Sequence, residues 1–311
     1  MHVYRSPEEL LGKGFGQTVV TIGTFDGVHK GHQTILQQLK NKSREKQLPG
    51  VVITFDPHPR ELLHPEQPIQ LLNTLEERIQ LFERHGIEHL VIVPFTRAFS
   101  LLSAEDYVEK FLVHYFHPAV IIIGYDHHFG HDRKGDIHLL ENLQHQYGYT
   151  LEEIPPQIVE QVTISSTRIR EYLAQGEIEL ANALLGYPYS LSGVVVRGDQ
   201  IGRKLGYPTA NLQIGDSRKL IPAEGVYAAT AQIDDDQLCR KGMLNIGYRP
   251  TFKGKELRIE MHIFDFSDDI YGHRIRIYLH AYLRPDQYFE SAEALRRQMD
   301  RDKIAALERL S

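Results

Sequence analysis

The hydrophobic pattern of this 311-residue chain changes its period at about residue 186. Before that point, short apolar runs that suit buried strands alternate with amphipathic stretches of helical spacing, which indicates a parallel sheet with helices on both faces. After it, apolar and polar residues alternate with the period of two that is typical of antiparallel strands. We therefore predict a doubly wound α/β domain over residues 1–186 and a small antiparallel β-barrel over 187–311 that ends in a helix.

Helix-capping pairs and glycines mark the ends of the predicted elements. Thr74 with Glu77 and Ser103 with Asp106 have the spacing of helix N-caps, and Gly148 follows a predicted helix. In the first domain, we predict strands over 18–23, 51–55, 89–94, 119–124 and 150–154 and helices over 32–47, 75–85, 104–115, 137–147, 164–174 and 178–185. In the second, we predict strands over 225–233, 238–246, 257–266 and 274–283 and a helix over 291–310 packed across the barrel.

Composition limits the ligands that this chain can bind. A formal net charge of −6 argues against a broad nucleic-acid footprint or an anionic membrane surface, so we expect small-molecule ligands and neither nucleic acid nor membrane as a partner. Cys239 is the only cysteine, which excludes an intrachain disulfide and a cysteine-based zinc site, and we expect a buried, inert thiol in a strand. The sequence shows no secretory leader and no membrane-spanning apolar run, so we predict a cytoplasmic protein.

The stretch VVTIGTFDGVHKGH at residues 19–32 predicts a phosphate-binding turn. An apolar strand ends at Gly23, a glycine-containing turn follows, and a helix then begins, so the backbone can approach an anion at a helix N-terminus. His29 and His32 are three residues apart and would share one helix face, where two imidazoles can donate hydrogen bonds to a triphosphate. The alternative is a helix start with two solvated imidazoles. The strand-turn-helix context favours the phosphate site.

The segment GRKLGYPTAN at residues 202–211 is the second unusual stretch. Its glycines and two cations make a loop that suits a polyphosphate, and Pro208 then stiffens the chain before Thr209 and Asn211. If that piece is extended, Thr209 and Asn211 share a face, and both side-chain oxygens can reach one Mg²⁺ bridged to ATP phosphates. A glycine-rich turn followed by an edge strand explains the same residues equally well.

A carboxylate in the predicted strand 257–266 is a candidate general base. Because Ile259 and Met261 share one face of that strand, Glu260 and His262 share the other. A lone carboxylate on a strand is more often a solvated surface group. Beside a Mg-ATP loop, Glu260 becomes a candidate to accept a proton from an attacking hydroxyl.

These motifs carry a family resemblance. HKGH at 29–32 resembles the HxGH signature of nucleotidyltransferases, and GRKLGYPTAN resembles the signature of riboflavin kinases. In this order, and over nearly the whole chain, they resemble the bacterial bifunctional riboflavin kinase/FMN adenylyltransferases, the FAD synthetases. The resemblance implies that ATP and Mg²⁺ convert riboflavin to FMN, and that a second ATP adenylylates FMN to give FAD and pyrophosphate.

The resemblance also implies roles in the first domain. His29 and His32 would contact the ATP phosphates and stabilise the departing pyrophosphate, and Gly31 would keep side-chain bulk away from that anion. Arg168, in ISSTRIR, would be a third catalytic residue at the phosphates. The other implied residues are Gly23, Phe25, Gly31, Asp126, Ser165, Ser166 and Thr167 for the nucleotide and Pro57, His58 and Phe129 for the flavin.

One position departs from the family pattern. His127 stands where the family has an aromatic phenylalanine, so a stacking role at that position is not carried over. With His128 and His131 it also offers an alternative zinc cluster. The loop has no cysteine and matches a nucleotide-binding segment, which favours the nucleotide interpretation.

In the second domain the resemblance implies a kinase site. Glu260 would be the catalytic base, and Thr209 and Asn211 would hold Mg²⁺ and the nucleotide. Arg249, in the segment NIGYRPTF, would contact the flavin. The implied nucleotide-binding loop residues are Gly202, Lys204 and Gly206.

Two rival functions use the same folds. One is a nucleotidyltransferase that acts on another phosphorylated alcohol and keeps the barrel as an accessory domain. The other is a non-catalytic flavin carrier or regulator, which needs no general base, so the presence of Glu260 speaks against it. RNA binding is less consistent with the negative net charge.

Overall fold

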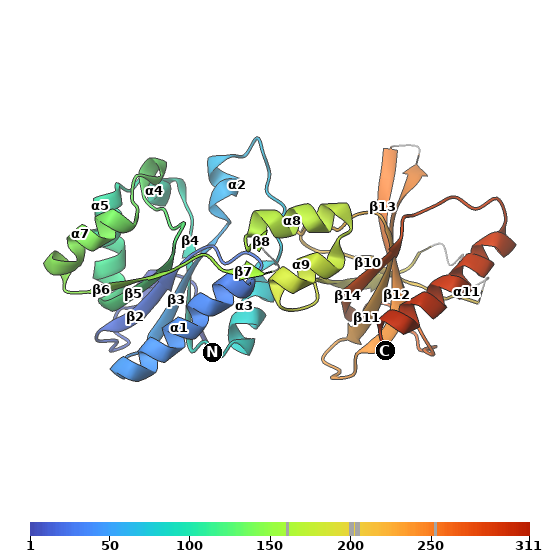
Figure 1. Ribbon diagram of the computed structural model, residues 1–311, viewed down its shortest axis with the longest axis horizontal. Helices are drawn as coiled ribbons and strands as arrows, with labels where there is room; N and C mark the ends of the chain where they lie inside the picture. The colour runs from blue at the N-terminus through green and yellow to red at the C-terminus, as the bar shows by residue number, and fades with distance from the viewer. Residues whose placement is uncertain (160–161, 199–201, 203–205, 252–253) are drawn as a thin grey trace. The chain divides into compact units, whose positions relative to one another are not determined.

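A computed structural model describes residues 1–159, 162–198, 202, 206–251 and 254–311 of the chain. By their contacts these residues form two compact units, Met1–Ser166 and Thr167–Ser311. Figure 1 shows that helices and strands are interspersed along the first unit, whereas strands dominate the second.

The first unit is built on a six-stranded sheet in the order β1-β4-β3-β2-β5-β6, and every pairing in it is parallel. Its strands are β1 (His2–Tyr4), β2 (Thr18–Ile22), β3 (Gly50–Asp56), β4 (His89–Pro94), β5 (Pro118–Gly124) and β6 (Thr150–Ile154). The longer helices are α1 (Lys30–Lys46), α3 (Leu75–Arg84) and α7 (Ile137–Tyr147). The shorter elements are η1 (Pro7–Leu10), α2 (Pro59–Leu63), α4 (Arg97–Ser100), α5 (Ala104–Asp106), η2 (Tyr107–Val113), α6 (His114–Phe116), η3 (His131–Arg133) and the strand pair β7 (Ile158–Val159) and β8 (Val162–Thr163).

The five strands predicted in this half are confirmed, each within one residue of its expected ends. The edge strand β1 was not predicted, because three residues are too few to show a period. The single helix expected over 104–115 is interrupted, since its middle turns are a π-helix, η2. Hydrophobic spacing does not distinguish a π-helical turn from an α-helical one.

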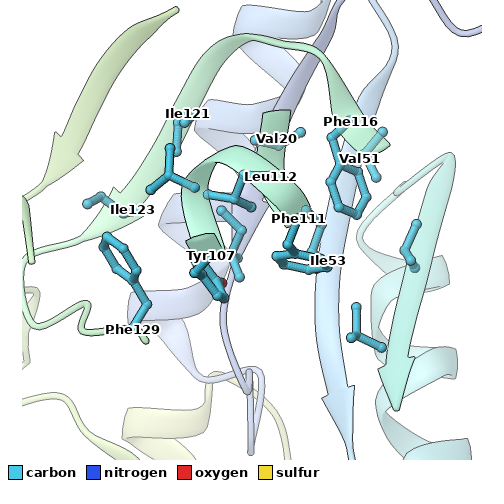
Figure 2. Packing of buried hydrophobic residues seen from close by; sticks show 14 of the residues in the cluster. Val20, Val51, Ile53, Tyr107, Phe111, Leu112, Phe116, Ile121, Ile123 and Phe129 are labelled. Carbon is cyan, nitrogen blue, oxygen red and sulfur yellow. The ribbon is translucent and has the colours of Figure 1, made fainter. Parts of the chain in front are cut away.

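Apolar side chains from both faces of the sheet meet helices. On one face, strand residues such as Val20, Ile53 and Ile121 pack with Tyr107 and Phe111 of η2 (Figure 2). On the other face, α1 packs against β2, β3 and β5 and buries two leucines. The doubly wound architecture is therefore confirmed, and its loops at the carboxyl ends of the strands are where such sheets bind ligands.

The second unit contains a closed antiparallel barrel in the order β10-β13-β12-β11-β14-β9. Its strands are β9 (Ser190–Val196), β10 (Ala210–Gln213), β11 (Gly225–Ile233), β12 (Arg240–Thr251), β13 (Gly254–Ile263) and β14 (Arg274–Arg284). Ile259, Met261 and Ile263 of β13 are all buried, as expected for residues on one face of the strand, but His262 on the other face is buried as well. The barrel was predicted, but strands β9 and β10 were not assigned, because their composition around glycine and proline hides the period of two.

Three helices accompany the barrel: α8 (Ser166–Gln175), α9 (Ile178–Leu185) and α11 (Ala292–Arg309). The terminal helix α11 contacts β11, β12 and β14, as predicted. It is held there by the carboxylate of Asp302, which accepts hydrogen bonds from the guanidinium of Arg284 at 2.8–3.1 Å. Asp302 is buried, so this ion pair is shielded from water.

The division by contacts falls earlier in the chain than the predicted domain boundary at 186/187. The helices between these two points pack with the barrel: the Asn182 side chain donates to the Leu279 carbonyl at 2.9 Å, and the Ala223 amide donates to the Leu173 carbonyl at 2.9 Å. The helices between residues 167 and 186 can pack with the barrel and still belong to the catalytic domain that precedes it in the chain. The functional boundary at 186/187 stays a prediction.

The expectation for Cys239 was wrong. Its side chain is exposed, because strand β12 begins one residue later, at Arg240. Among the described residues, no helix is both long and apolar enough to cross a membrane.

Candidate active sites

The turn between β2 and α1 has an unusual backbone. Phe25 and Val28 have φ angles of 49° and 33°, in the left-handed region that β-branched and bulky residues rarely adopt, and Gly27 has a φ of 88°. Both apolar side chains are at most 1% exposed. The turn therefore keeps a strained backbone by burying its own side chains, an arrangement that recurs at functional sites.

Asp26 fixes this turn from inside the protein. Its carboxylate is buried and accepts hydrogen bonds from the backbone amides of Leu72 at 3.0 Å and Asn73 at 3.1 Å. Its own carbonyl accepts a hydrogen bond from the Ser166 hydroxyl at 2.8 Å. Ser166, predicted in the nucleotide site, is thus attached directly to the HxGH turn.

A buried guanidinium connects the same turn to the neighbouring strand. Arg78 of α3 donates to the Thr24 carbonyl at 2.5 Å and to the Phe55 carbonyl at 3.2 Å. The Thr54 hydroxyl also donates to the Thr24 carbonyl, at 3.1 Å. These hydrogen bonds hold the carboxyl ends of β2 and β3 together. Sequence analysis did not identify Arg78, because no motif includes it.

His29 and His32 lie together at the start of α1. Their rings stack with centroids 3.6 Å apart and an interplanar angle of 14°. His29 is the N-cap of the helix rather than part of its first turn, and its Nδ1 accepts the backbone N–H of His32 at 3.3 Å. His29 is only 5% exposed. Because its Nδ1 accepts a hydrogen bond, a neutral His29 carries its proton on Nε2.

His32 is held in its neutral form. Burial lowers the pKa of His32 well below its ordinary value, and the charges of His29 and Arg78 lower it further. Its ring meets the edge of Phe25, with centroids 5.1 Å apart. A Cβ on Gly31 would lie 3.2 Å from Nδ1 of His29. This glycine leaves room for the His29 ring, in addition to the predicted clearance for an anion.

The segment after β5 contributes polar residues and one core aromatic. Asp126 is exposed, whereas Phe129 is buried and stacks on Tyr107 with centroids 4.9 Å apart (Figure 2). His127 stacks on Phe129 at 5.7 Å, and burial lowers the pKa of His127 to about 4. The described residues contain no cluster of three His, Cys, Asp or Glu suited to a metal, so the zinc alternative gains no support. The flavin contact of Phe129 stays a prediction.

Pro57 and His58 follow the carboxyl end of β3. The Asp56–Pro57 peptide bond is cis. His58 is buried and is the N-cap of α2: its Nδ1 accepts the Arg60 amide at 3.1 Å, and Glu61 accepts the His58 amide at 3.0 Å. His58 thus has a structural role, and its predicted flavin contact is not tested.

The start of α8 joins the two compact units. Ser165 and Ser166 belong to the first, whereas Thr167 and Arg168 belong to the second. The Arg168 guanidinium donates to the Glu171 carboxylate at 2.8 Å and lies 5.1 Å from the centre of the Tyr172 ring. The phosphate contacts of Thr167 and Arg168 stay predictions.

The barrel brings a second group of polar residues together through strand register. Glu260 of β13 lies opposite Asn211 of β10 on one side and Asn245 of β12 on the other. The Thr209 hydroxyl donates to the Glu260 carboxylate at 3.2 Å. Thr209, Asn211 and Glu260, which the sequence predicted as one site, are therefore neighbours.

Asn245 is the residue that sequence reasoning left out of this site. Its Oδ1 is buried and accepts no hydrogen bond from any described residue. An orphaned buried oxygen beside a carboxylate is costly unless a ligand, an ion or water completes it. The predicted strand ends, 246 and 257, would have paired Asn245 with Arg258. The hairpin extends further, to Thr251 and Gly254, and this longer ladder places Asn245 beside Glu260.

The glycine loop is described only in part. A Cβ on Gly202 would lie 2.2 Å from the backbone carbonyl oxygen of Tyr207, so this position requires glycine. A Cβ on Gly198 would lie 2.4 Å from the side-chain nitrogen of Asn211, so a side chain there would displace Asn211. Gly206 has a φ of 85°, which glycine adopts without strain. Lys204 lies outside the described residues. The Arg249 backbone pairs with Glu256, and its flavin contact stays a prediction.

Two family models together match most of the chain. The model described as FAD synthetase matches residues 13–168, and the model described as riboflavin kinase matches residues 185–310. The first range contains the His29–His32 pair, and the second contains the Thr209, Asn211 and Glu260 group.

Curated relatives match nearly end to end. The bifunctional riboflavin kinase/FMN adenylyltransferase of Escherichia coli K12 is 36% identical over 290 residues, which is 93% of this chain and 92% of the relative. The enzyme of the same description from Pseudomonas fluorescens is 37% identical over 93% of this chain and 91% of the relative. A solved structure described as a macrolide-efflux protein from Streptococcus pneumoniae has a TM-score of 0.86 at 33% identity, covering 98% of both chains.

Proposed function

The chain belongs to the bifunctional riboflavin kinase/FMN adenylyltransferases, which make FMN and then FAD, and we propose that its two sites divide these reactions. The barrel site would phosphorylate riboflavin, and the His29–His32 site would adenylylate the FMN. ATP and flavins are the substrates that the family name implies.

In the barrel, Glu260 is the proposed general base. The 5′-hydroxyl oxygen of the riboflavin ribityl chain forms a bond to the γ-phosphorus of ATP, while the bond from that phosphorus to the bridging oxygen of ADP breaks. Glu260 takes the hydroxyl proton, and ADP leaves. The 3.2 Å hydrogen bond from Thr209 orients the carboxylate before substrate arrives.

Thr209 and Asn211 are the proposed Mg²⁺ ligands. Their side chains offer neutral oxygens, which suit this hard cation when substrate phosphates supply the negative ligands. The buried, unpartnered Oδ1 of Asn245 is a further oxygen on the opposite side of Glu260, and neutral oxygens of this kind together with a carboxylate fit the ion. When bound, Mg²⁺ would neutralise charge on the phosphates, and the protein residues would hold ATP against the riboflavin hydroxyl.

In the α/β unit, the proposed chemistry needs no protein nucleophile. A phosphate oxygen of FMN, already an anion, forms a bond to the α-phosphorus of ATP, and the bond to pyrophosphate breaks. The Nε2–H of His29 and the backbone amides of Lys30 and Gly31 would donate to the charge that develops on the leaving group, because the His32 amide already donates to Nδ1 of His29. A neutral His32 stacked on His29 limits the motion of that donor.

The single observation that carries the kinase assignment is the register that puts Asn211 and Asn245 on either side of Glu260. To test the division of labour, purified protein would be incubated with riboflavin, ATP and Mg²⁺, and the flavins separated by chromatography over time. We expect FMN to accumulate first and FAD to follow. If substitutions of the barrel residues left the rate of FMN formation unchanged while FAD still formed from riboflavin, the proposed division between the two sites would be wrong.

We expect the enzyme to work in the cytoplasm, where ATP is supplied. Its partners would be flavins and ATP.

A further inference from the structure

Residues 207–211, which carry the proposed magnesium ligands, are fastened in place by side chains that take no part in the proposed chemistry. We propose that His262, Tyr207 and Asp300 are positioning residues for the kinase site. They hold this segment so that Thr209 and Asn211 face Glu260, which makes the C-terminal helix α11 a support of that site. The inference rests on the proposed role of Thr209 and Asn211 toward Mg²⁺.

His262 holds the segment from strand β13. Its side chain is only 7% exposed, and its Nδ1 lies 2.7 Å from the carbonyl oxygen of Pro208, the residue before Thr209. A carbonyl only accepts, so Nδ1 carries the proton and donates it. Burial lowers the pKa of His262, and the charge of Lys303 lowers it further, which outweighs the opposing effects of this hydrogen bond and of Asp265. The imidazole is therefore a neutral, fixed donor.

Tyr207 holds the same segment from α11. Its hydroxyl donates to the Asp300 carboxylate, and the rings of Tyr207 and His262 meet edge to face with centroids 5.0 Å apart. A carboxylate only accepts, so the Tyr207 hydroxyl is the donor of this hydrogen bond. The Tyr207 amide donates to the Gly202 carbonyl at 2.8 Å. Tyr207 thus connects the proposed phosphate loop, His262 and α11.

Helix α11 is itself fixed to the barrel by other contacts. The ion pair between Asp302 and Arg284 attaches it to β14. The ammonium of Lys303 lies 5.2 Å from the centre of the Phe264 ring, which in turn meets His262 at 5.6 Å. Asp300 therefore acts from a rigid support. Mutation of residues that orient metal ligands typically lowers metal affinity or activity by about 10- to 100-fold.

Matched variants separate the hydrogen bonds from the packing. His262→Phe and Tyr207→Phe keep the rings and remove the donors, whereas His262→Gln keeps a donor and Asp300→Asn keeps an acceptor. We expect the two Phe variants to raise the Mg²⁺ concentration for half-maximal riboflavin phosphorylation roughly 10-fold, with the KM for riboflavin changed less than about twofold. His262→Gln and Asp300→Asn should need nearly the same Mg²⁺ concentration for half-maximal riboflavin phosphorylation as the parent protein. FMN adenylylation by the same samples should be unchanged.

Hydrogen–deuterium exchange gives a readout that does not depend on activity. Without Mg²⁺ and ATP, we expect backbone amides in residues 206–213 to exchange faster in His262→Phe and Tyr207→Phe, with exchange in the α/β unit unchanged. A lower melting temperature with unchanged Mg²⁺ dependence and unchanged exchange in this segment would show a purely structural role and overturn the proposal.

Thr209→Ala distinguishes this proposal from the one on which it rests. If Thr209→Ala raises the Mg²⁺ requirement while His262→Phe and Tyr207→Phe do not, the positioning role is wrong and the metal site stands. If Thr209→Ala leaves the Mg²⁺ requirement unchanged, the proposed metal site is wrong, and the positioning role toward it is wrong too.

Discussion

The two candidate sites are built in opposite ways. The His29–His32 site comes from one continuous stretch, in which a strained turn and a helix cap place two rings 3.6 Å apart. The barrel site comes from three strands, whose register brings Asn211, Asn245 and Glu260 side by side. The first depends on local backbone conformation and the second on long-range pairing.

This difference decides what supports each site. The strained turn is held by residues outside its own stretch. The backbone amides of Leu72 and Asn73 donate to Asp26, and the guanidinium of Arg78 donates to the Thr24 carbonyl. Ladder hydrogen bonds fix the barrel strands, and the short segment before β10 is held in addition by the side chains of His262 and Tyr207. Disturbing one site should therefore leave the other intact, which the following variants test.

The largest effect is expected from Glu260→Gln. Without a carboxylate to take the hydroxyl proton, riboflavin phosphorylation should fall by roughly 10²–10⁴-fold. Conversion of added FMN to FAD should remain at the parental rate, because it uses the other unit. Chromatographic assay of both reactions in one preparation checks this, with the exposed Glu293→Gln as the matched control. An equal loss in both reactions would show that the sites are not independent.

His29→Ala should do the reverse. Losing the Nε2–H donor should lower FMN adenylylation by roughly 10²–10³-fold, and losing the helix cap should cost about 1 kcal/mol of stability. His29→Asn separates the two roles, because it restores a capping acceptor without reaching the phosphates. Denaturant unfolding and the FMN-to-FAD rate are the measurements. A His29→Ala variant with full adenylyl transfer would remove this histidine from the chemistry.

Asp26→Asn should give a smaller effect in the same unit. The amide keeps one acceptor but turns N–H groups toward the amides of Leu72 and Asn73, so the unfolding free energy should fall by about 1–3 kcal/mol. Displacement of the turn should slow FMN adenylylation roughly 10-fold while riboflavin phosphorylation is retained. Asp132→Asn, on an exposed aspartate of the same unit, is the control. If Asp26→Asn lowered riboflavin phosphorylation instead of FMN adenylylation, the expectation that each site is supported independently would be wrong.

The smallest effect is expected from His127→Phe. Burial lowers the pKa of His127 to about 4, below its unfolded value of about 6.5, so the unfolded chain binds the extra proton in this interval. The stability contribution is present above about pH 6.5 and is lost as the pH falls toward 4. The variant should therefore show a smaller drop in melting temperature between pH 7.5 and 5, unlike the exposed control His138→Gln.

The elements of the fold were largely predictable from the sequence. Strands β4 and β6 have the predicted ends, because apolar runs between capped helices leave few alternatives. The capping box at Thr74 and Glu77 was also visible in the sequence and is confirmed. Cys239 was placed wrongly, since alternation alone did not show that the ladder begins at Arg240.

What the sequence determined by itself is local: where strands and helices lie, which two stretches carry phosphate chemistry, and the family. Spacing along the chain fixes these properties, because hydrophobic period and capping act over a few residues. The tertiary structure alone decided that Arg78 joins β2 to β3, that Asn245 lies beside Glu260, and that Asp300 reaches Tyr207. The hydrogen-bonded pairs are 23 to 93 residues apart, and the pairing of Asn245 with Glu260 depends on strand register, so only the packed fold brings these partners together.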